Sequence, residues 1–120
     1  MPSELRFSIL CAALTLGASV AFADCQRAGQ DDAIAEGRIT QRADALILEL
    51  PQEICLEGED EFDSVDDTSE IHVFSSDDGV QATLRGLIGK DVQLRGTLMG
   101  AHTQHHKAPI IMDVSEADEI

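Results

Sequence analysis

Apolar and polar residues alternate along five segments of the chain, and this period of two is typical of half-buried β-strands. The segments are residues 33–41, 45–50, 70–74, 91–101 and 108–114. In the second segment, Leu46, Leu48 and Leu50 fall on one face. Pro51 ends this strand or marks a sheet edge, and residues 54–56 are expected to be a short buried continuation. The pattern predicts a mainly β-structure.

One further segment has a helical period. Residues 80–88 place apolar side chains at helical spacing over two turns, and Asp77 and Asp78 offer capping groups before it. The acidic stretch 57–69 is predicted to be a loop. The order strand, strand, strand, helix, strand, strand predicts an all-β domain with one short helix, folded as a five-stranded Greek-key barrel of the oligonucleotide/oligosaccharide-binding (OB) type. A small β-sandwich or a half-open roll is the alternative.

Three glycines fit a closed barrel. Gly37 sets Ile34 and Ile39 out of phase within the first strand, which suggests a bulge or a sharp bend. Gly96 and Gly100 occur where a tightly coiled strand leaves little room for a side chain. The residues after Ser115 are polar and are expected to fray, so the core should span about residues 33–115.

The first 23 residues have the features of a cleaved secretory signal peptide. Arg6 supplies a positive charge, residues 7–23 are uncharged and apolar, and Ala21-Phe22-Ala23 has the small-x-small form of a cleavage site. A run of about 17 residues is at the short limit for crossing a bilayer, so a retained membrane anchor is the alternative. We expect a periplasmic or secreted bacterial protein without stable membrane insertion, whose mature chain, residues 24–120, is a single domain.

Removal of a signal peptide would leave two cysteines, Cys25 and Cys55. In an oxidising compartment such a pair predicts one disulfide, and two buried free thiols are the alternative. Two thiolates without a CxxC spacing cannot complete a tetrahedral metal shell. Asp24 precedes Cys25 where lipid attachment requires a small residue, which argues against a lipoprotein.

The chain is strongly acidic, with a formal net charge of −15. From Glu53 to Asp78 there are eleven Asp or Glu residues and no Lys or Arg. A solvated acidic loop is the first interpretation. A calcium loop is the alternative, although the ligand order of an EF-hand is absent.

This charge, together with the aromatic content, excludes one common function of OB barrels. Binding of single-stranded nucleic acid requires a basic groove and aromatic stacking platforms. The predicted mature chain has seven Lys or Arg against twenty-two Asp or Glu, no Trp or Tyr, and only Phe62 and Phe74. We therefore expect no nucleic-acid partner, and instead a protein partner, a cationic peptide or a divalent ion.

Three histidines lie together between the last two predicted strands: His102, His105 and His106. Neutral imidazole is a ligand for zinc or copper, so these residues are the candidate metal site, which Asp113 or a carboxylate of the acidic loop could complete. The alternative is a structural loop, because adjacent residues of an extended segment point to opposite sides and Lys107 adds a positive charge. His72 is expected to stand alone and face solvent.

The segment from Gly89 to Leu98, followed by Ala101, Thr103 and His105-His106, resembles the domain of unknown function 4431 (DUF4431) family. The cysteine-bearing segment 54–56 before the acidic stretch is also similar to that family, and the resemblance spans about residues 37–114. Lys107 and Ala108 depart from the further histidine and threonine that are common in the family. The resemblance implies a secreted bacterial protein with an OB-like barrel, and it implies no activity.

No motif for a catalytic nucleophile, a phosphate-binding loop or a zinc protease is present. The sequence therefore predicts a small periplasmic binding or interaction module without catalysis and without a required cofactor. The alternative function is a periplasmic protein that binds a transition metal through the histidine loop. A hydrolase is a third and more distant alternative.

Overall fold

The structure is a computed structural model, and it describes residues 25–60, 63–102 and 106–120. The strands and the single helix follow one another along the chain as β1 (Gln26–Arg27), β2 (Ala33–Arg42), β3 (Ala45–Glu57), β4 (Val65–Phe74), α1 (Asp78–Gly86), β5 (Asp91–Gly100) and β6 (Ile110–Glu119). The predicted order of three long strands, one helix and two further strands is confirmed. The two-residue strand β1 was not predicted.

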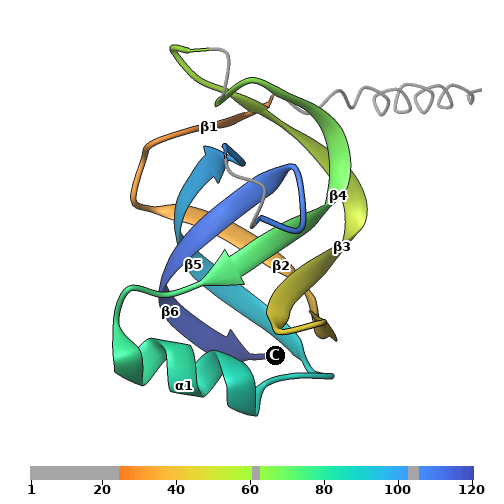
Figure 1. Ribbon diagram of the computed structural model, residues 1–120, viewed down its shortest axis with the longest axis vertical. Helices are drawn as coiled ribbons and strands as arrows, with labels where there is room; N and C mark the ends of the chain where they lie inside the picture. The colour runs from red at the N-terminus through yellow and green to blue at the C-terminus, as the bar shows by residue number, and fades with distance from the viewer. Residues whose placement is uncertain (1–24, 61–62, 103–105) are drawn as a thin grey trace, which may run out of the picture.

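The five long strands close into a barrel (Figure 1). Antiparallel ladders join β2 to β3, β3 to β4, β5 to β6 and β2 to β5, and a parallel ladder joins β4 to β6. The parallel pair arises because the chain crosses over through α1 and β5 before it returns beside β4. This is the strand order of a five-stranded Greek-key barrel, so the predicted fold class is confirmed.

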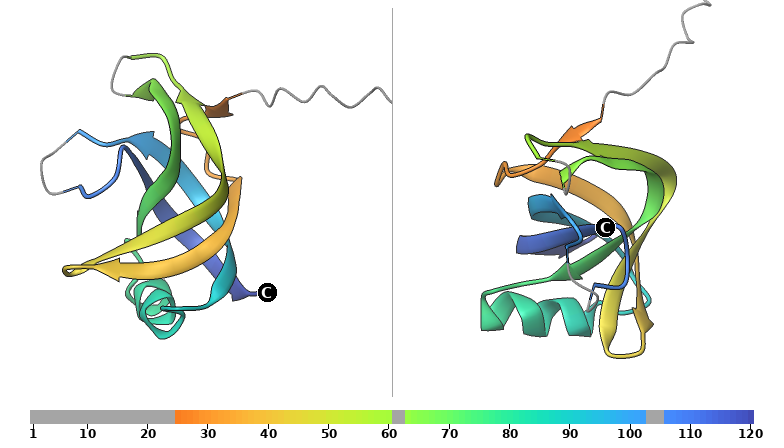
Figure 2. Two further views of the ribbon diagram at one scale, coloured as in Figure 1. Left: turned by 90° about the vertical axis from the view of Figure 1, so that its right-hand side faces the viewer. Right: turned by 45° about the horizontal axis from the view of Figure 1, so that its top comes forward.

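Alternation along the strands places one set of side chains inside the barrel. In β5, Val92, Leu94 and Leu98 are fully buried, and Ile110 and Met112 of β6 meet them in the core. The helix contributes only one fully buried residue, Leu84, and it lies across one end of the barrel (Figures 1 and 2). Asp77 caps this helix by accepting a hydrogen bond of 3.0 Å from the backbone N–H of Val80, as predicted.

Two glycines allow close approach of neighbouring strands. A Cβ atom at Gly37 would overlap the backbone carbonyl of Glu49, and a Cβ atom at Gly96 would overlap the carbonyl of Asp113. A register shift occurs beside Gly96, between Arg95 and Gly96. The expectation of little side-chain room is confirmed at Gly96, and Gly37 marks the place where the pairing of β2 with β3 ends.

Two boundaries predicted from the sequence were wrong. Strand β4 begins at Val65, inside the stretch predicted to be a loop, because its acidic residues face solvent while Ile54 and Leu56 of β3 provide backbone pairing. Strand β6 continues to Glu119 rather than fraying after Ser115, since its last residues pair with the start of β5. Strand β3 continues through Pro51, and its pairing with β2 stops at Glu49, so Pro51 marks a sheet edge, which was one of the two expectations for it.

The predicted Cys25–Cys55 disulfide is present, with a Cα–Cα distance of 4.7 Å. It attaches the segment before β1 to strand β3, and Cys55 is half-buried rather than part of the core. Within the residues that the structure describes, no helix is both long and apolar enough to cross a bilayer. The predicted signal peptide lies outside the described residues.

Candidate functional site

Two features of the surface could bind a ligand, and the first is a histidine cluster formed by His72 of strand β4 with His102 and His106 of the connection between β5 and β6. The ring of His106 packs edge-on against His72, with the ring centroids 5.7 Å apart, and against His102, with centroids 5.3 Å apart. His72 was expected to stand alone and face solvent, and this was wrong. The parallel pairing of β4 with β6 brings His72 beside the loop that leads into β6.

Hydrogen bonds fix the proton positions on these rings. The backbone N–H groups of Lys107 and His102 donate to Nδ1 of His72 and to Nδ1 of His106, at 3.2 and 3.4 Å. Both rings therefore carry their proton on Nε2 when neutral. Nδ1 of His102 lies 3.1 Å from the carbonyl oxygen of Gly100, which can only accept, so its Nε2 keeps the free lone pair. A metal ion bound by all three rings would have to displace at least two of these backbone contacts.

The other proposed ligands are placed as follows. The carboxylate of Asp113 accepts hydrogen bonds from the backbone and side chain of Ser76, in the connection between β4 and α1. Asp63, from the acidic connection between β3 and β4, accepts a hydrogen bond of 3.0 Å from the backbone N–H of Gly100. His105 lies outside the described residues. No group of three His, Cys, Asp or Glu side chains suited to a metal ion occurs among residues 25–60, 63–102 and 106–120.

An arginine holds the end of the histidine loop against the barrel. Arg42 donates two hydrogen bonds to the carboxylate of Glu70, at 3.0 and 2.7 Å, and a third of 3.1 Å to the carbonyl oxygen of Lys107. Hydrogen bonding to Arg42 lowers the pKa of the Glu70 carboxyl, and the same contact raises the pKa of Arg42. The loop end is thus bonded through Lys107 to both β2 and β4.

His106 and Lys107 lie against His72 on the outer face of strand β4. His72 is in register with Ile47 of β3 and Ile111 of β6, and both isoleucines are buried although they lie outside the main core cluster. In OB barrels, the second and third strands form the usual binding face for oligonucleotides and oligosaccharides. In this chain those strands are β3 and β4, and part of that face is covered by the protein's own loop.

The contacts of His72 predict a pH-dependent stability. Burial lowers the pKa of His72, the positive charges of His106 and Lys107 lower it further, and Asp44 opposes them. Because the folded-state pKa lies below the ordinary value of about 6.5, the fold favours the neutral ring. The neutral His72 ring makes its full contribution to stability at pH values above the unfolded-state pKa. This contribution is lost as the pH falls through the folded-state pKa of His72.

We therefore expect the free energy of unfolding to decrease as the pH is lowered from about 7.5 to about 5.5, around the ordinary histidine pKa. In His72→Gln the decrease should be smaller, since glutamine can accept the Lys107 hydrogen bond but does not titrate. Urea unfolding at several pH values measures this effect. Equal pH dependence in the two proteins would contradict the role assigned to His72.

The second feature is a groove beside strand β2. Strand β2 pairs with β3 only from Arg38 to Arg42, and residues 33–37 pair with β5 alone. Three adjacent concavities follow this unpaired side of β2. The first two share Gln26 and Ile34, and the last two share Glu36, Leu50 and Pro51, so they form one continuous β2 groove.

The middle of the β2 groove is apolar and has a volume of about 190 Å³. Its base includes Leu98 of the core and Ile54, which packs against the core, because the gap between β2 and β3 exposes the margin of the interior. Ile34 stands at its edge and is 43% exposed. At about 30 Å³ per water molecule, this space is sufficient for one or two aliphatic side chains.

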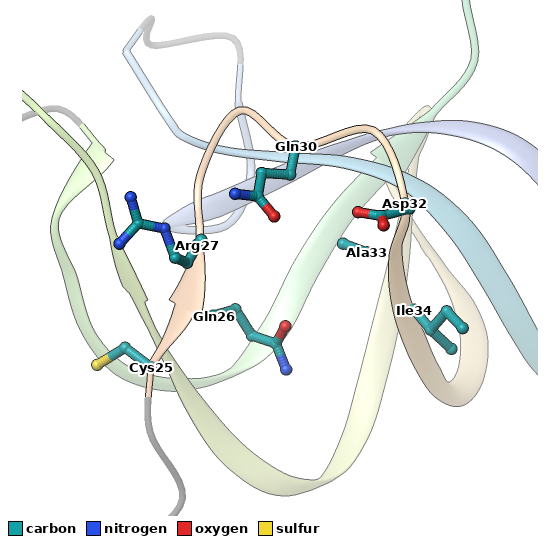
Figure 3. Close-up of a pocket in the computed structure, with 7 residues that line it drawn as sticks. All are labelled: Cys25, Gln26, Arg27, Gln30, Asp32, Ala33 and Ile34. Atoms are coloured by element: carbon teal, nitrogen blue, oxygen red, sulfur yellow. The ribbon is translucent and has the colours of Figure 1, made fainter.

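The two ends of the β2 groove are polar. At the end near the disulfide, Gln26, Gln30 and Asp32 direct their side chains towards the middle of the concavity, whereas Arg27 points away (Figure 3). At the other end the lining carboxylates include Glu36 and Glu49.

One cation at this second end is already paired. Arg38 forms an ion pair of 3.2 Å with Asp91, and within the described part of the chain no ion pair joins Glu36 or Glu49 to a basic side chain. The second end therefore carries an excess of negative charge, and at the first end Asp32 faces the concavity while Arg27 points away from it.

Comparison with known proteins gives a family. Residues 70–118 match the model of a family described as a domain of unknown function, DUF4431. This similarity to the DUF4431 family covers 49 of the 120 residues of the chain. The match runs from Glu70 within strand β4 to Asp118 within strand β6. It includes His72 and the histidine loop, and it does not include the cysteine-bearing segment of β3. No curated protein and no solved structure matches the chain.

The DUF4431 match leaves the β2 groove largely outside its range. Of the groove residues, Asp91 and Leu98 of β5 lie within the matched segment 70–118. The groove residues of β2 and β3 precede this segment in the sequence. The sequence drew attention to the histidine loop and missed the groove. One signal was available: Ile34 falls on the same strand face as Glu36 and Arg38, where an apolar residue is out of place in a solvated pattern.

Proposed function

We propose that this protein is a non-catalytic binding module of the bacterial periplasm or the extracellular space, and that it binds its partner through the β2 groove. The carrying observation is that the middle of the groove exposes Leu98 of the core and Ile54, which packs against the core, between two polar ends. Pockets that combine an apolar base with a few placed polar groups are the usual form of binding sites. The disulfide and the signal-like first 23 residues support an exported protein.

Two further observations favour the β2 groove over the usual OB surface. The outer face of β3 and β4 is covered by the residues that follow His105, which are bonded through Lys107 to Arg42 and His72. The charge of the chain is also unsuited to phosphate backbones, so nucleic acid is not proposed as a partner. Binding in the β2 groove requires neither an uncovered β3–β4 face nor a basic surface.

A periplasmic metal-binding protein that uses His102, His105 and His106 is the second candidate. One observation favours it, namely that the His102 and His106 rings are already in contact and that Nε2 of His102 keeps a free lone pair. Zinc or copper is the metal that such ligands would take. Against it stand the two backbone N–H groups that occupy Nδ1 of His72 and of His106.

Native mass spectrometry of the exported protein, purified from the cells that naturally make it, distinguishes the two candidates. The binding module should begin at Asp24, contain the disulfide, and retain an associated partner that is lost in Ile34→Ser. Ile88→Ser is the matched control, because Ile88 is similarly exposed at 37% but follows α1 and does not line the groove. A retained zinc or copper ion that disappears in His102→Ala would instead favour the metal-binding function.

A further inference from the structure

We propose that the β2 groove binds an extended polypeptide segment in which two basic side chains flank an apolar one on the same face. This inference rests on the proposed function and adds the chemical class of the partner. It follows from the residue types that line the groove in order along β2. One end is polar and contains Asp32, the middle is apolar beside Ile34, and the other end is acidic with Glu36 and Glu49.

The dimensions of the groove favour an extended chain over a compact ligand. The groove follows β2 from residue 33 to residue 38, and six residues of a strand span roughly 20 Å. Ile34 and Glu36 of β2 are two residues apart, which is about 6.6 Å in extended chain, and Asp32 lies in the turn just before the strand. A second extended segment running alongside presents the side chains of one face at this same spacing. Its positions i, i+2 and i+4 would then meet a carboxylate, an apolar cleft and a second carboxylate.

Charge determines which side chains fit at the two ends. Asp32 and Glu36 are exposed, and no ion pair within the described residues neutralises either of them. The amide side chains of Gln26 and Gln30 add oxygen acceptors around the first end, and Arg27 is directed away from it (Figure 3). Lysine or arginine at both ends is therefore favoured, and an acidic side chain is excluded by repulsion.

The middle of the groove selects an aliphatic side chain. Leu50, Ile54 and Leu98 line it, and all three belong to the core or pack against it. Burying a valine or leucine side chain here removes apolar surface of both molecules from water, which a polar side chain would not do. An apolar residue between the two basic ones completes the pattern.

The test is an NMR titration of the oxidised mature protein with three synthetic heptapeptides. The first peptide, Ser-Lys-Thr-Val-Thr-Lys-Ser, has the proposed pattern. In the second the lysines are replaced by glutamates, and in the third the valine is replaced by serine. We expect the first peptide to shift the amide signals of groove residues with saturation, and the other two to bind at least about fivefold more weakly, as expected for lost charge pairs or a lost apolar contact.

Variants of the protein localise the effect. Glu36→Lys should weaken binding of the first peptide by about fivefold to tenfold, and added salt should weaken binding to the unmodified protein. Asp118→Lys is the matched charge reversal, because Asp118 is an exposed carboxylate beside α1, and it should leave the affinity within about twofold. Ile34→Ser should also weaken binding, while Ile88→Ser should not.

Several outcomes would overturn the inference. Equal binding of all three peptides in the groove would refute the proposed pattern and leave the groove as a binding site. Absence of any shift would refute the peptide partner. It would leave the proposed function to be tested by native mass spectrometry, which detects a retained partner of any chemical class. Shifts caused by dilution alone would show that a second copy of the chain occupies the groove instead.

Discussion

Loss of the Cys25–Cys55 disulfide should lower the free energy of unfolding by about 3–4 kcal/mol. The bond joins residues 30 positions apart, so its removal restores a large loop entropy to the unfolded chain. It also holds β1 against β3, where only Gln26 and Arg27 pair with Leu56 and Glu57. In a domain of this size, a change of this magnitude corresponds to a decrease of roughly 15–25 °C in the melting temperature.

Thermal unfolding of Cys55→Ala, compared with the oxidised and the reduced wild-type protein, measures this effect. The reduced wild type is the control, because it loses the bond but keeps both side chains. The variant and the reduced protein should have similar stability, both well below the oxidised protein. Equal melting temperatures of the oxidised and reduced wild type would show that the disulfide does not stabilise the barrel.

Replacement of Gly96 by alanine should destabilise the barrel by about 2–3 kcal/mol or more. A Cβ atom there meets the backbone carbonyl of Asp113, and a backbone atom cannot rotate away as a side chain can. The substitution must therefore separate β5 from β6 at the register shift beside Gly96. Fewer hydrogen bonds would then join these strands.

Gly86→Ala is the control for this prediction. Gly86 is the last residue of α1, and a Cβ atom at this position would meet no neighbouring atom within 4 Å, so the added methyl group has open space. The substitution should leave the stability unchanged or raise it by about 0.5–1 kcal/mol, since alanine is the better helix former. Urea unfolding of both variants provides the comparison, and similar losses in the two would contradict the close-approach explanation for Gly96.

The local pattern of the sequence was sufficient to predict the fold class. The structure contains what three local patterns predicted. Alternation predicted β5 and β6, helical spacing after Asp77 predicted α1, and the glycine at position 96 predicted a position without room for a side chain. The wrong boundaries have a common cause. The acidic start of β4 and the polar end of β6 contain little apolar signal, and they become strands because a neighbouring strand offers backbone partners.

The candidate sites were harder to predict, because they depend on residues that are distant in the sequence. His72 joins the histidine loop only through the parallel pairing of β4 with β6. The groove requires β2 and β3 to lie apart over residues 33–37, where the side chains of Gln26, Ile34 and Ile54 come together. The disulfide was predictable because only two cysteines lie outside the predicted signal peptide.

The central claim is that the protein acts as a binding module through the β2 groove. A photo-crosslinking amino acid placed at position 34, in the full-length protein expressed in its natural host, tests it most directly. Position 88 is the control, since Ile34 and Ile88 have similar exposures of 43% and 37%. We predict one defined crosslinked partner at position 34, absent at position 88 and reduced by Glu36→Lys. The same crosslinks at both positions, or none at position 34, would contradict the account.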